Sequence, residues 1–327
     1  METDYDGKNI LENRQMNMNR EFYEKLCGCT APERVKEQEP MARHTTFRVG
    51  GPADYFVSPS DSEEIKKLTE LCKKEGVQYY IVGNGSNLLV SDDGYRGVII
   101  AIGREMSGIE VRGEQIRAQA GALMSQIAAA ALENELAGFE FASGIPGTIG
   151  GAAVMNAGAY GGEMKDVIVQ VTALDRDGNT IVLSQDELEF GYRTSAVMKR
   201  GCIVLEACIR LEKGSREEIL MKMEDFKQRR ITKQPLEYPS AGSTFKRPEG
   251  YFAGKLIQDA GLREFTVGGA QVSEKHSGFV INKGGATAED VNRLMQEVSD
   301  RVYREFGVRL EPEVRRIGEF RNRRDER

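Results

Sequence analysis

The sequence predicts an α+β fold rather than a doubly wound parallel sheet. Residues 109–121 and 167–183 each have the pattern of a β-hairpin, and the second turns at Asp177-Gly178, a dipeptide typical of tight hairpins. Helical patterns stand singly between such hairpins instead of alternating regularly with strands. The chain of 327 residues, 40% hydrophobic and 29% charged, is long enough for two or three domains.

The first elements predict a strand–helix–strand unit. Residues 46–59 alternate like a pair of strands broken at Gly50-Gly51-Pro52. A helix is expected from an N-cap at Asp61 to Gly76, with one apolar face. A buried strand over residues 77–83 and another strand over 97–103 complete the unit.

The remaining elements follow in the same way, each bounded by turn or capping residues. We expect helices over residues 122–138, 215–230, 253–262 and 287–307, strands over 202–211, 277–284 and 308–318, and a loop over 233–250. Residues 215–230 have a long amphipathic pattern, and Thr287 is the expected cap of the last helix. Residues 1–30 show no clear periodicity beyond a short helix near 12–26.

Composition and charge exclude several classes of protein. A formal net charge of −6 argues against nucleic acid as the main partner, and the basic residues 315–327 are typical of a solvated tail. The acidic N-terminus lacks a signal peptide's apolar core, and the longest apolar run, 127–132, is too short for a membrane span. Only two histidines, His44 and His276, are present, so no metal site is expected.

The cysteine pattern indicates a reducing compartment. There are five cysteines, an odd number, and they are scattered rather than paired at metal-binding spacings. We therefore expect a cytoplasmic protein that is neither attached to a membrane nor bound to nucleic acid, and we expect a monomer. The cysteines are Cys27, Cys29, Cys72, Cys202 and Cys208.

The first glycine cluster, VGNGSNLLV at residues 82–90, follows a predicted strand. It fails as a dinucleotide fingerprint, because Leu88 occupies the third glycine position and no helix pattern follows. What remains is a tight turn whose successive N–H groups suit a phosphate oxygen, although a plain turn is an equally simple interpretation. The candidate residues are Gly83, Asn84, Gly85, Ser86, Asn87 and Leu88.

The second cluster, GIPGTIGGAAVMNAGAYGG at residues 144–162, contains no Lys or Arg. Its glycines alternate with apolar residues such as Ile149, which indicates an ordered loop and not a flexible spacer. Anion binding here would depend on backbone N–H groups, helped by Thr148 and Asn156. A purely structural crossover remains an alternative.

Polar side chains that suit acid–base and carboxylate chemistry lie farther along the chain. An Arg can hold a carboxylate with two hydrogen bonds, a hydroxyl can deliver a proton, and a Glu beside cations is suited to acid–base work. Surface ion pairs and a turn serine explain the same residues equally well, and His276 is interpreted as a surface residue. The candidates are Arg193, Ser243, Lys246, Arg247, Glu313 and Arg315.

Several motifs together resemble the UDP-N-acetylenolpyruvoylglucosamine reductase family. They are HTTFRVGGPADYFV, VGNGSNLLVSD, GIPGTIGGAAVMNAGAYGGE, FGYRTS, YPSAGSTFKRP, HSGFVIN and LEPEVRRIG, in the family's order over about residues 40–318. The resemblance implies a cytoplasmic FAD enzyme of peptidoglycan synthesis. It also implies an FAD-binding fold of the vanillyl-alcohol-oxidase type, built of two subdomains, and a third domain that closes over a UDP-sugar.

The resemblance also implies roles for individual residues. Arg193, Ser243 and Glu313 match the catalytic positions, and Tyr160, Arg247 and Arg315 match expected substrate contacts. Non-covalent FAD would lie against residues 83–88 and the second glycine cluster. The cofactor-binding residues implied in that cluster are Ser143, Gly144, Pro146, Gly147, Thr148, Gly150, Gly151, Asn156 and Gly158.

The implied reaction begins with reduction of FAD by NADPH. Hydride would then pass to C3 of the enolpyruvyl group of UDP-N-acetylglucosamine enolpyruvate, giving UDP-N-acetylmuramate. Arg193 and Glu313 would stabilise the negative charge on the substrate carboxylate, and Ser243 would protonate C2. Only about ten residues separate Arg193 from Ile203, so this chain resembles the branch without an inserted tyrosine-bearing loop.

Two other functions remain open. One is a different FAD oxidoreductase of the same fold, and the other is a nucleotide-binding regulatory module without activity; Ser243 and Glu313 argue against the second. The implied domain division is a leader (1–40), FAD-binding subdomains (41–103 and 104–214), a substrate-binding domain (215–318) and a basic tail (319–327).

Overall fold

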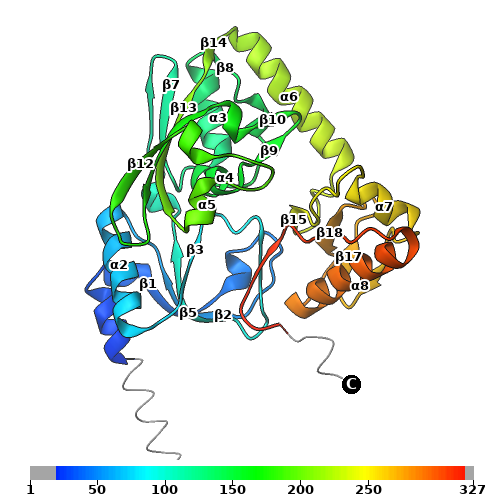
Figure 1. The fold of residues 1–327 in the computed structure, drawn as a ribbon, viewed down its shortest axis with the longest axis horizontal. Helices are drawn as coiled ribbons and strands as arrows, with labels where there is room; N and C mark the ends of the chain where they lie inside the picture. The colour runs from blue at the N-terminus through cyan, green and yellow to red at the C-terminus, as the bar shows by residue number, and fades with distance from the viewer. Residues whose placement is uncertain (1–19, 321–327) are drawn as a thin grey trace, which may run out of the picture.

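The computed structural model describes residues 20–320. The first half of the predicted leader and nearly all of the predicted basic tail lie outside the described residues. Figure 1 shows three bodies: a lower one built around β2 and β5, an upper one with α3, α4 and α5, and a third one at the right with α7 and α8. The mixture of hairpins, parallel pairs and single helices confirms the predicted α+β class.

The first body is a four-stranded sheet in the order β1-β2-β5-β3. β2 and β3 both run parallel to β5, and α2 connects them, as the strand–helix–strand prediction requires. α2 begins after the side-chain cap of Asp61 and ends at Gly76, which has a φ of 67°. The elements are β1 (Val35–Pro40), β2 (Pro52–Val57), α2 (Ser62–Glu75), β3 (Tyr79–Val82), β4 (Leu88–Val90) and β5 (Tyr95–Ala101).

The start of the first body differs from the sequence-based expectation. Residues 46–49 form a turn and irregular structure, not a strand. Residues 35–40, assigned to the leader, form β1 and pair with β2 at every position except Gln38. β1 has polar residues around the buried Val35, so no apolar pattern marks it, and the backbone pairing defines it. The leader therefore ends before residue 35, and a helix over residues 20–27 packs Phe22 and Leu26 against this body.

The second body is a five-stranded antiparallel sheet in the order β12-β11-β13-β7-β6. Both predicted hairpins are confirmed, with Gly178 at a φ of 83° in the second turn. α3 ends at Glu133, five residues before the predicted end, because Glu135 takes a left-handed conformation and β8 follows. The elements are β6 (Ile109–Arg112), β7 (Gln115–Gln119), α3 (Met124–Glu133), β8 (Leu136–Ala137), α4 (Ile149–Met155), β9 (Gly158–Ala159), β10 (Gly162–Glu163), β11 (Ile168–Leu174), β12 (Thr180–Ser184), α5 (Ala196–Arg200), β13 (Ile203–Arg210) and β14 (Glu212–Lys213).

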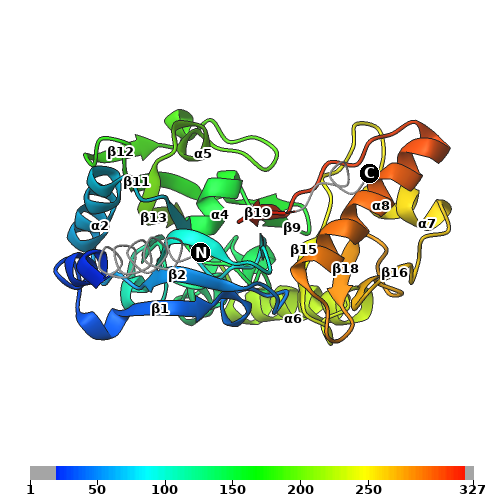
Figure 2. The same cartoon turned by 90° about the horizontal axis from the view of Figure 1, so that it is seen from below.

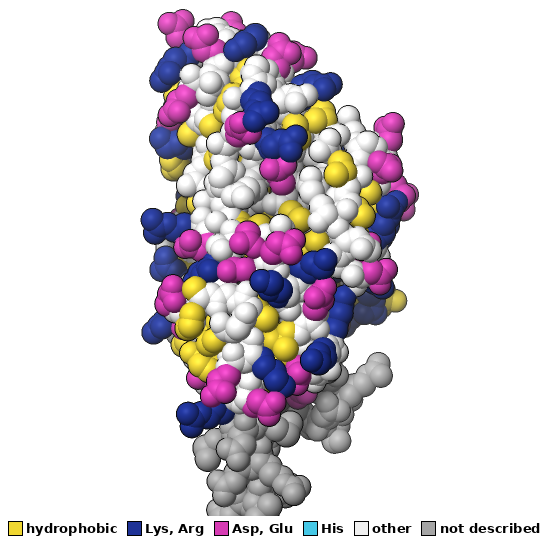
Figure 3. Space-filling view, turned by 90° about the vertical axis from the view of Figure 1, so that its left-hand side faces the viewer, with side chains coloured by type: hydrophobic (Ala, Val, Ile, Leu, Met, Phe, Trp, Pro, Cys, Tyr) yellow, Lys and Arg dark blue, Asp and Glu magenta, His cyan; other side chains and the backbone are white. Residues whose placement is uncertain are grey.

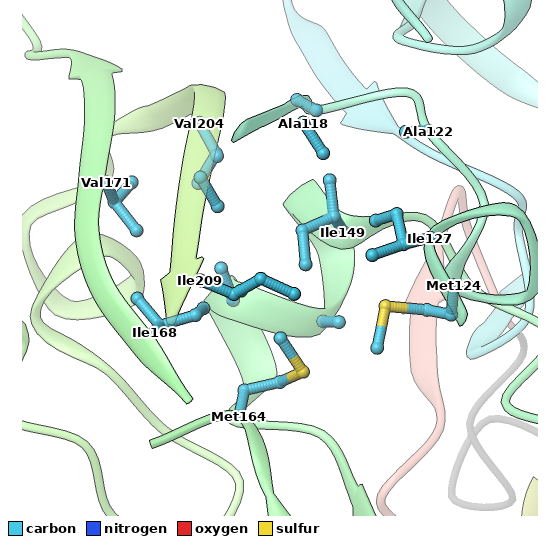
Figure 4. Packing of buried hydrophobic residues seen from close by; sticks show 14 of the residues in the cluster. Ala118, Ala122, Met124, Ile127, Ile149, Met164, Ile168, Val171, Val204 and Ile209 are labelled. Carbon is cyan, nitrogen blue, oxygen red and sulfur yellow. The ribbon is translucent and has the colours of Figure 1, made fainter. Parts of the chain in front are cut away.

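The core of the second body lies between this sheet and the helices that cover it. Figure 4 shows Ile149 of α4 beside Ile127 of α3, facing Ala118 and Ile209 of the sheet. Ile149 is fully buried, as are Ala153 of the same helix and Ile127. Seven helical residues inside the glycine-rich segment are thus held in place by apolar packing.

The third body is a small sheet in the order β15-β18-β17-β16, covered by α7 and α8 (Figure 2). β15 lies within the segment predicted to be a loop; it contains no apolar pattern and forms by pairing with β18. α6 runs from the second body to the third, with Ile219 as its one buried residue. The elements are α6 (Arg216–Lys233), β15 (Ser240–Ser243), α7 (Ala253–Asp259), β16 (Thr266–Val267), β17 (Ala270–Val272), β18 (Phe279–Asn282), α8 (Ala288–Phe306) and β19 (Arg315–Ile317).

The chain leaves the third body and returns to the first. β19 pairs in parallel with β4, so that Arg315 lies opposite Leu88. The carboxylate of Asp92 accepts hydrogen bonds from the backbone N–H groups of Ala288 and Glu289, at 2.8 and 2.9 Å, at the start of α8. These contacts join the third body firmly to the first.

The surface carries charges of both signs. On the face shown in Figure 3, acidic and basic side chains alternate without a large area of one sign. All five cysteines are free thiols. Among residues 20–320, no helix has the length and apolar character needed to cross a bilayer. The same residues contain no group of three or more His, Cys, Asp or Glu side chains that could hold a metal ion.

Candidate active site

The turn at residues 83–87 is lined with unused backbone donors. Within the described part of the chain, none of its five N–H groups donates a hydrogen bond to another group. The carbonyls of Gly85 and Asn87 point the other way and accept hydrogen bonds from Thr46 and Arg315. A run of N–H groups that faces outward in this way forms an anion-binding nest.

Close packing holds this turn in its conformation. Gly85 has a φ of 60°, and a Cβ at that position would lie 1.9 Å from the carbonyl oxygen of His44. A Cβ on Gly83 would lie 2.4 Å from Oγ1 of Thr148. The side chain of Asn84 donates a hydrogen bond of 2.7 Å to the carbonyl of Pro146. The structure therefore brings the two predicted glycine clusters into direct contact.

The second cluster is partly helical, which corrects its description as a loop. α4 begins after Thr148, whose Oγ1 accepts a 3.4 Å hydrogen bond from Gly151 N–H. The N–H groups of Ile149 and Gly150 donate to the carbonyls of Ala122 and Ala120. The donors at the start of α4 are thus occupied, whereas the N–H groups of Gly147 and Thr148, just before the helix, have no partner among the described residues.

Other predicted cofactor residues are engaged with the protein itself. Ser143 donates its hydroxyl to the carbonyl of Glu140, and the carbonyl of Gly144 accepts a hydrogen bond from Arg230 on α6. Gly158 pairs with Glu163 in the β9–β10 ribbon. The side chain of Asn156 has partners on all its polar groups. No direct observation links these four residues to a cofactor, and their predicted contact stays a prediction.

A first cavity of about 650 Å³ borders the turn and the segment before α4. Gly83, Asn84 and Pro146 lie on one side, and residues 236–240, at the start of the third body, lie on another. Several cationic side chains line it, and the ring of His44 stacks on Phe56 at 4.0 Å between centroids. The cationic lining residues are Lys36, Arg43, Arg48 and Arg104.

A second cavity of about 420 Å³ joins the three predicted catalytic residues, Arg193, Ser243 and Glu313. They come from the turn before α5, the end of β15 and the segment before β19, and Arg247 lines the same cavity. Arg193 Nε lies 2.6 Å from Glu313 Oε1, and both side chains are largely buried. Arg193 Nε has no aligned hydrogen-bond acceptor among the described residues, so this contact is an ion pair of close charges.

Backbone pairing places Ser243 beside Glu313. Glu313 N–H donates to the carbonyl of Thr244, the residue after Ser243, at 2.8 Å. The side chain of Asn87 donates to the carbonyl of Glu313 at 3.2 Å. Glu313 is thus tied both to the strand that carries Ser243 and to the glycine turn, and the cavity lies next to the nest.

The other two predicted substrate residues do not line this cavity. Tyr160 stacks on Phe226 of α6, with ring centroids 4.6 Å apart and an interplanar angle of 4°. Nη2 of Arg315 lies 2.8 Å from the sulfur of Met198. Their predicted substrate contacts remain untested.

One wall of the second cavity was not predicted from the sequence. This wall is formed by α7, the segment that follows it and the turn before β18. Its three cations, together with Arg193 and Arg247, give the cavity five cationic side chains, whereas Glu313 is its single carboxylate. The three cations of this wall, Lys255, Arg263 and Lys275, belong to separate segments, so no charge cluster is visible in the sequence. The missed lining residues are Lys255, Gln258, Arg263, Lys275, His276 and Ser277.

His276 is half-buried in the cavity wall, which corrects its interpretation as a surface residue. Its Nδ1 accepts a 3.1 Å hydrogen bond from Gly278 N–H, and its ring meets Phe279 edge-on. Burial lowers the pKa of this imidazole. Gly254 and Gly278 leave room for the ring, since a Cβ on Gly278 would lie 2.9 Å from Cε1. In the sequence, these two glycines were the feature that could have indicated a buried ring at His276.

The two cavities suit different parts of one reaction. The nest offers neutral donors for a diphosphate, and the second cavity offers a guanidinium, a carboxylate and a hydroxyl beside a cationic wall. A Cβ at residue 83 or 85 would clash with Thr148 or His44, so glycine is required here for the turn to pack against its neighbours.

Comparison with known proteins gives concordant results. A family model described as an FAD binding domain matches residues 53–184, and a second, described as the C-terminal domain of UDP-N-acetylenolpyruvoylglucosamine reductase, matches residues 234–317. The UDP-N-acetylenolpyruvoylglucosamine reductase of Clostridioides difficile is 51% identical, covering 92% of this chain and 99% of that protein. The same enzyme of Clostridium perfringens strain SM101 is 54% identical, covering 93% and 99%. The crystal structure of the Thermus caldophilus enzyme superposes with a TM-score of 0.76 at 36% identity, covering 87% of this chain and 99% of that one.

Proposed function

Because this chain belongs to the UDP-N-acetylenolpyruvoylglucosamine reductase family, we propose that Arg193, Ser243 and Glu313 are its catalytic residues. The chain is an FAD-dependent oxidoreductase. It uses NADPH to reduce UDP-N-acetylglucosamine enolpyruvate to UDP-N-acetylmuramate in peptidoglycan precursor synthesis. The observation that supports the residue assignment is that three distant parts of the chain place these side chains on one cavity.

The residues of the turn fit the diphosphate of FAD. When bound, FAD supplies the hydride chemistry that no side chain of the protein can provide. The N–H groups of residues 83–87, with those of Gly147 and Thr148, would hold the diphosphate, because they have no other partner in the described chain. The glycines at 83 and 85 let the turn pack against Thr148 and His44 in the conformation that leaves these N–H groups free.

Arg193 and Glu313 would act on the carboxylate of the enolpyruvyl group. Addition of hydride to C3 moves negative charge onto that carboxylate, and a largely buried guanidinium such as that of Arg193 stabilises such charge. Removing one such group typically costs a factor of about 10²–10³ in turnover. The ion pair with Glu313 would orient Arg193 and limit the net charge of the site.

Ser243 would protonate C2 after the hydride has been added. It lies at the end of β15, next to the residue that binds Glu313 N–H, so its hydroxyl borders the same cavity as Arg193. The cationic wall opposite, with Arg247, would bind the diphosphate of the UDP-sugar. Tyr160 and Arg315 would contact substrate from outside this cavity, where Tyr160 now stacks on Phe226 and Arg315 lies beside Met198.

We also propose the cellular setting that the sequence predicts. The enzyme would work in the cytoplasm as a monomer, without nucleic acid or membrane partners, and its product would support cell shape, division and the cell cycle. The five free thiols agree with a reducing compartment. The domain division at residues 41–103, 104–214 and 215–318 remains part of this proposal, with β1 added to the first domain.

The test separates the two halves of the reaction. Flavin reduction by NADPH and flavin reoxidation by UDP-N-acetylglucosamine enolpyruvate are measured in turn for Ser243→Ala. We expect reduction by NADPH to be kept and reoxidation by substrate to fall about 10²-fold or more. The control is Ser184→Ala, an exposed serine on β12 bonded to Glu187, which should behave as wild type. An equal loss in both halves would contradict the proton-donor role.

A further inference from the structure

Arg193 lies in a turn that its own backbone does not favour. Its φ is +55°, a left-handed conformation that costs a residue with a Cβ about 1 kcal/mol. The turn is closed by hydrogen bonds between Gly191 and Thr194, at 3.1 and 3.3 Å. Side chains outside the turn must therefore keep Arg193 in this position against the cavity.

Asn156 supplies one of those contacts. Its Nδ2 donates to the carbonyl of Gly191 at 3.1 Å and to Glu163 Oε2 at 2.9 Å, and its Oδ1 accepts from Lys165 N–H at 2.9 Å. The last contact defines the orientation of the amide, because a backbone N–H can only donate. Asn156 is 1% exposed, so its amide has no free group to offer a ligand.

Ser195 supplies a second contact on the other side of Arg193. Its hydroxyl donates to the carbonyl of Val154 at 2.8 Å and accepts from Met198 N–H at 3.3 Å, and the residue is fully buried. Asn156 and Val154 both lie at the C-terminal end of α4. The turn that presents Arg193 is thus tied at both ends to a helix that is itself packed into the core (Figure 4).

We propose that Asn156 is a positioning residue for Arg193 and not a ligand of FAD. The amide would hold the Gly191 carbonyl, and through it the turn, so that the guanidinium keeps its place 2.6 Å from Glu313. This inference rests on the proposed function, in which Arg193 stabilises charge on the substrate. Asn156, in the glycine-rich segment, would then affect catalysis without touching cofactor or substrate.

The main test is Asn156→Gly. Glycine tolerates the φ of +45° at this position, so the variant removes the amide without adding backbone strain. We expect the rate of flavin reoxidation by UDP-N-acetylglucosamine enolpyruvate to fall about 10–100-fold, since small displacements of a catalytic group have effects of that size. FAD affinity and flavin reduction by NADPH should stay within about twofold of wild type. The matched control is Asn134→Ala, which removes an exposed amide that also donates to a backbone carbonyl.

A double-mutant cycle with Arg193→Ala separates this inference from the proposed function. If Asn156 acts through Arg193, Asn156→Gly should change the rate by less than about twofold in the Arg193→Ala background. An undiminished Asn156→Gly effect in that background, or a large rise in the FAD dissociation constant, would overturn the positioning role. An Arg193→Ala variant with normal reoxidation would instead contradict the proposed function.

If Asn156→Gly does not fold, Asn156→Asp provides the same test. It keeps the size of the side chain and the bond from Lys165 N–H but loses the donor to Gly191 and faces Glu163. The same slow reoxidation with normal FAD binding is expected, and normal reoxidation would overturn the inference.

Discussion

The turn at residues 83–87 and the start of α4 are both rich in glycine, and both were predicted to bind phosphate. They differ in where their N–H groups point. The five donors of the turn have no partner in the described chain, whereas Ile149 and Gly150 donate to the carbonyls of the segment that joins β7 to α3. Glycine content and a helix start are therefore not sufficient for an anion site.

The difference has a simple physical origin. In the turn, Gly85 lets the backbone pass close to His44 with its carbonyls directed inward, which leaves the N–H groups outward. At α4, Gly150 lets the helix approach Ala120 closely enough for a backbone hydrogen bond. Glycine allows close packing in both segments, but the packing leaves the N–H groups free in the first and occupies them in the second.

The largest effect is expected from Gly85→Ala. The new Cβ would lie 1.9 Å from the His44 carbonyl at a φ of +60°, and we expect a loss of roughly 3 kcal/mol or more in unfolding free energy. FAD should also be lost, which flavin absorbance after gel filtration will report.

Gly113→Ala is the matched control for this variant. Gly113 has the same φ of +60° but no neighbour within 4 Å, so alanine should cost only about 1 kcal/mol. Equal stability of the two variants in urea unfolding would show that close approach at the turn is unimportant.

Gly150→Ala should destabilise the protein without weakening FAD binding. Its Cβ would lie 2.8 Å from the Cβ of Ala120, and overpacking of this kind costs about 1–3 kcal/mol. Gly151→Ala has its nearest neighbour at 3.7 Å and should stabilise the helix by up to about 1 kcal/mol. Flavin titration is the measurement; a tenfold loss of FAD affinity in Gly151→Ala would place the start of α4 at the diphosphate.

Asp92→Ala tests the start of α8, where two backbone N–H groups donate to a carboxylate of the first body. It removes the acceptor of two N–H groups of α8, so we expect a loss of about 1–2 kcal/mol in thermal or urea unfolding. FAD affinity should not change. The neighbouring Asp93→Ala, which removes a side chain without a bonded partner in the described chain, should have little effect; an equal effect would contradict the capping role.

The smallest effect is expected at Glu39, which supports the turn at residues 83–87 through His44. This buried carboxylate lies 2.9 Å from Nε2 of His44, whose carbonyl faces Gly85. Burial acts to raise the pKa of Glu39, but the hydrogen bond with His44 and the charge of Lys36 oppose it and leave the pKa lowered. A carboxyl group with a lowered pKa stabilises the fold above its ordinary value of 4.5 and loses that contribution as the pH falls through the lowered value.

Glu39→Gln should remove this pH dependence. The difference in unfolding free energy between wild type and Glu39→Gln should be largest near neutral pH and shrink below about pH 4.5. A difference that grows on acidification would reverse the assigned sign.

The elements that could be predicted are those whose ends are determined by residues close to them in the sequence. Asp61, Gly76 and Thr287 mark helix ends by their own side chains or conformation, and Asp177-Gly178 marks a hairpin. β1 and β15 could not be predicted, because each exists through pairing with a distant strand and has little apolar pattern. α4 was missed because glycine disfavours helices, and its burial in the core outweighs that preference.

The candidate site was predictable only where family motifs mark it. Arg193, Ser243 and Glu313 were found by motif, and the structure adds that they share a cavity. The cationic wall was missed because Lys255, Arg263 and Lys275 belong to segments that meet only after folding. Asn156 was given a cofactor role, since a polar residue in a glycine loop does not reveal which backbone group its amide will hold.

The return of the chain through β19 has a mechanical consequence. Thr244, Glu313 and Asn87 are linked in series by hydrogen bonds at the crossing between the third body and the first. Glu313 can therefore not shift without disturbing both the strand that carries Ser243 and the glycine turn that carries Asn87. A substitution that moves either of these segments should be felt at the Glu313 carboxylate, even when the substitution itself lies outside the cavity.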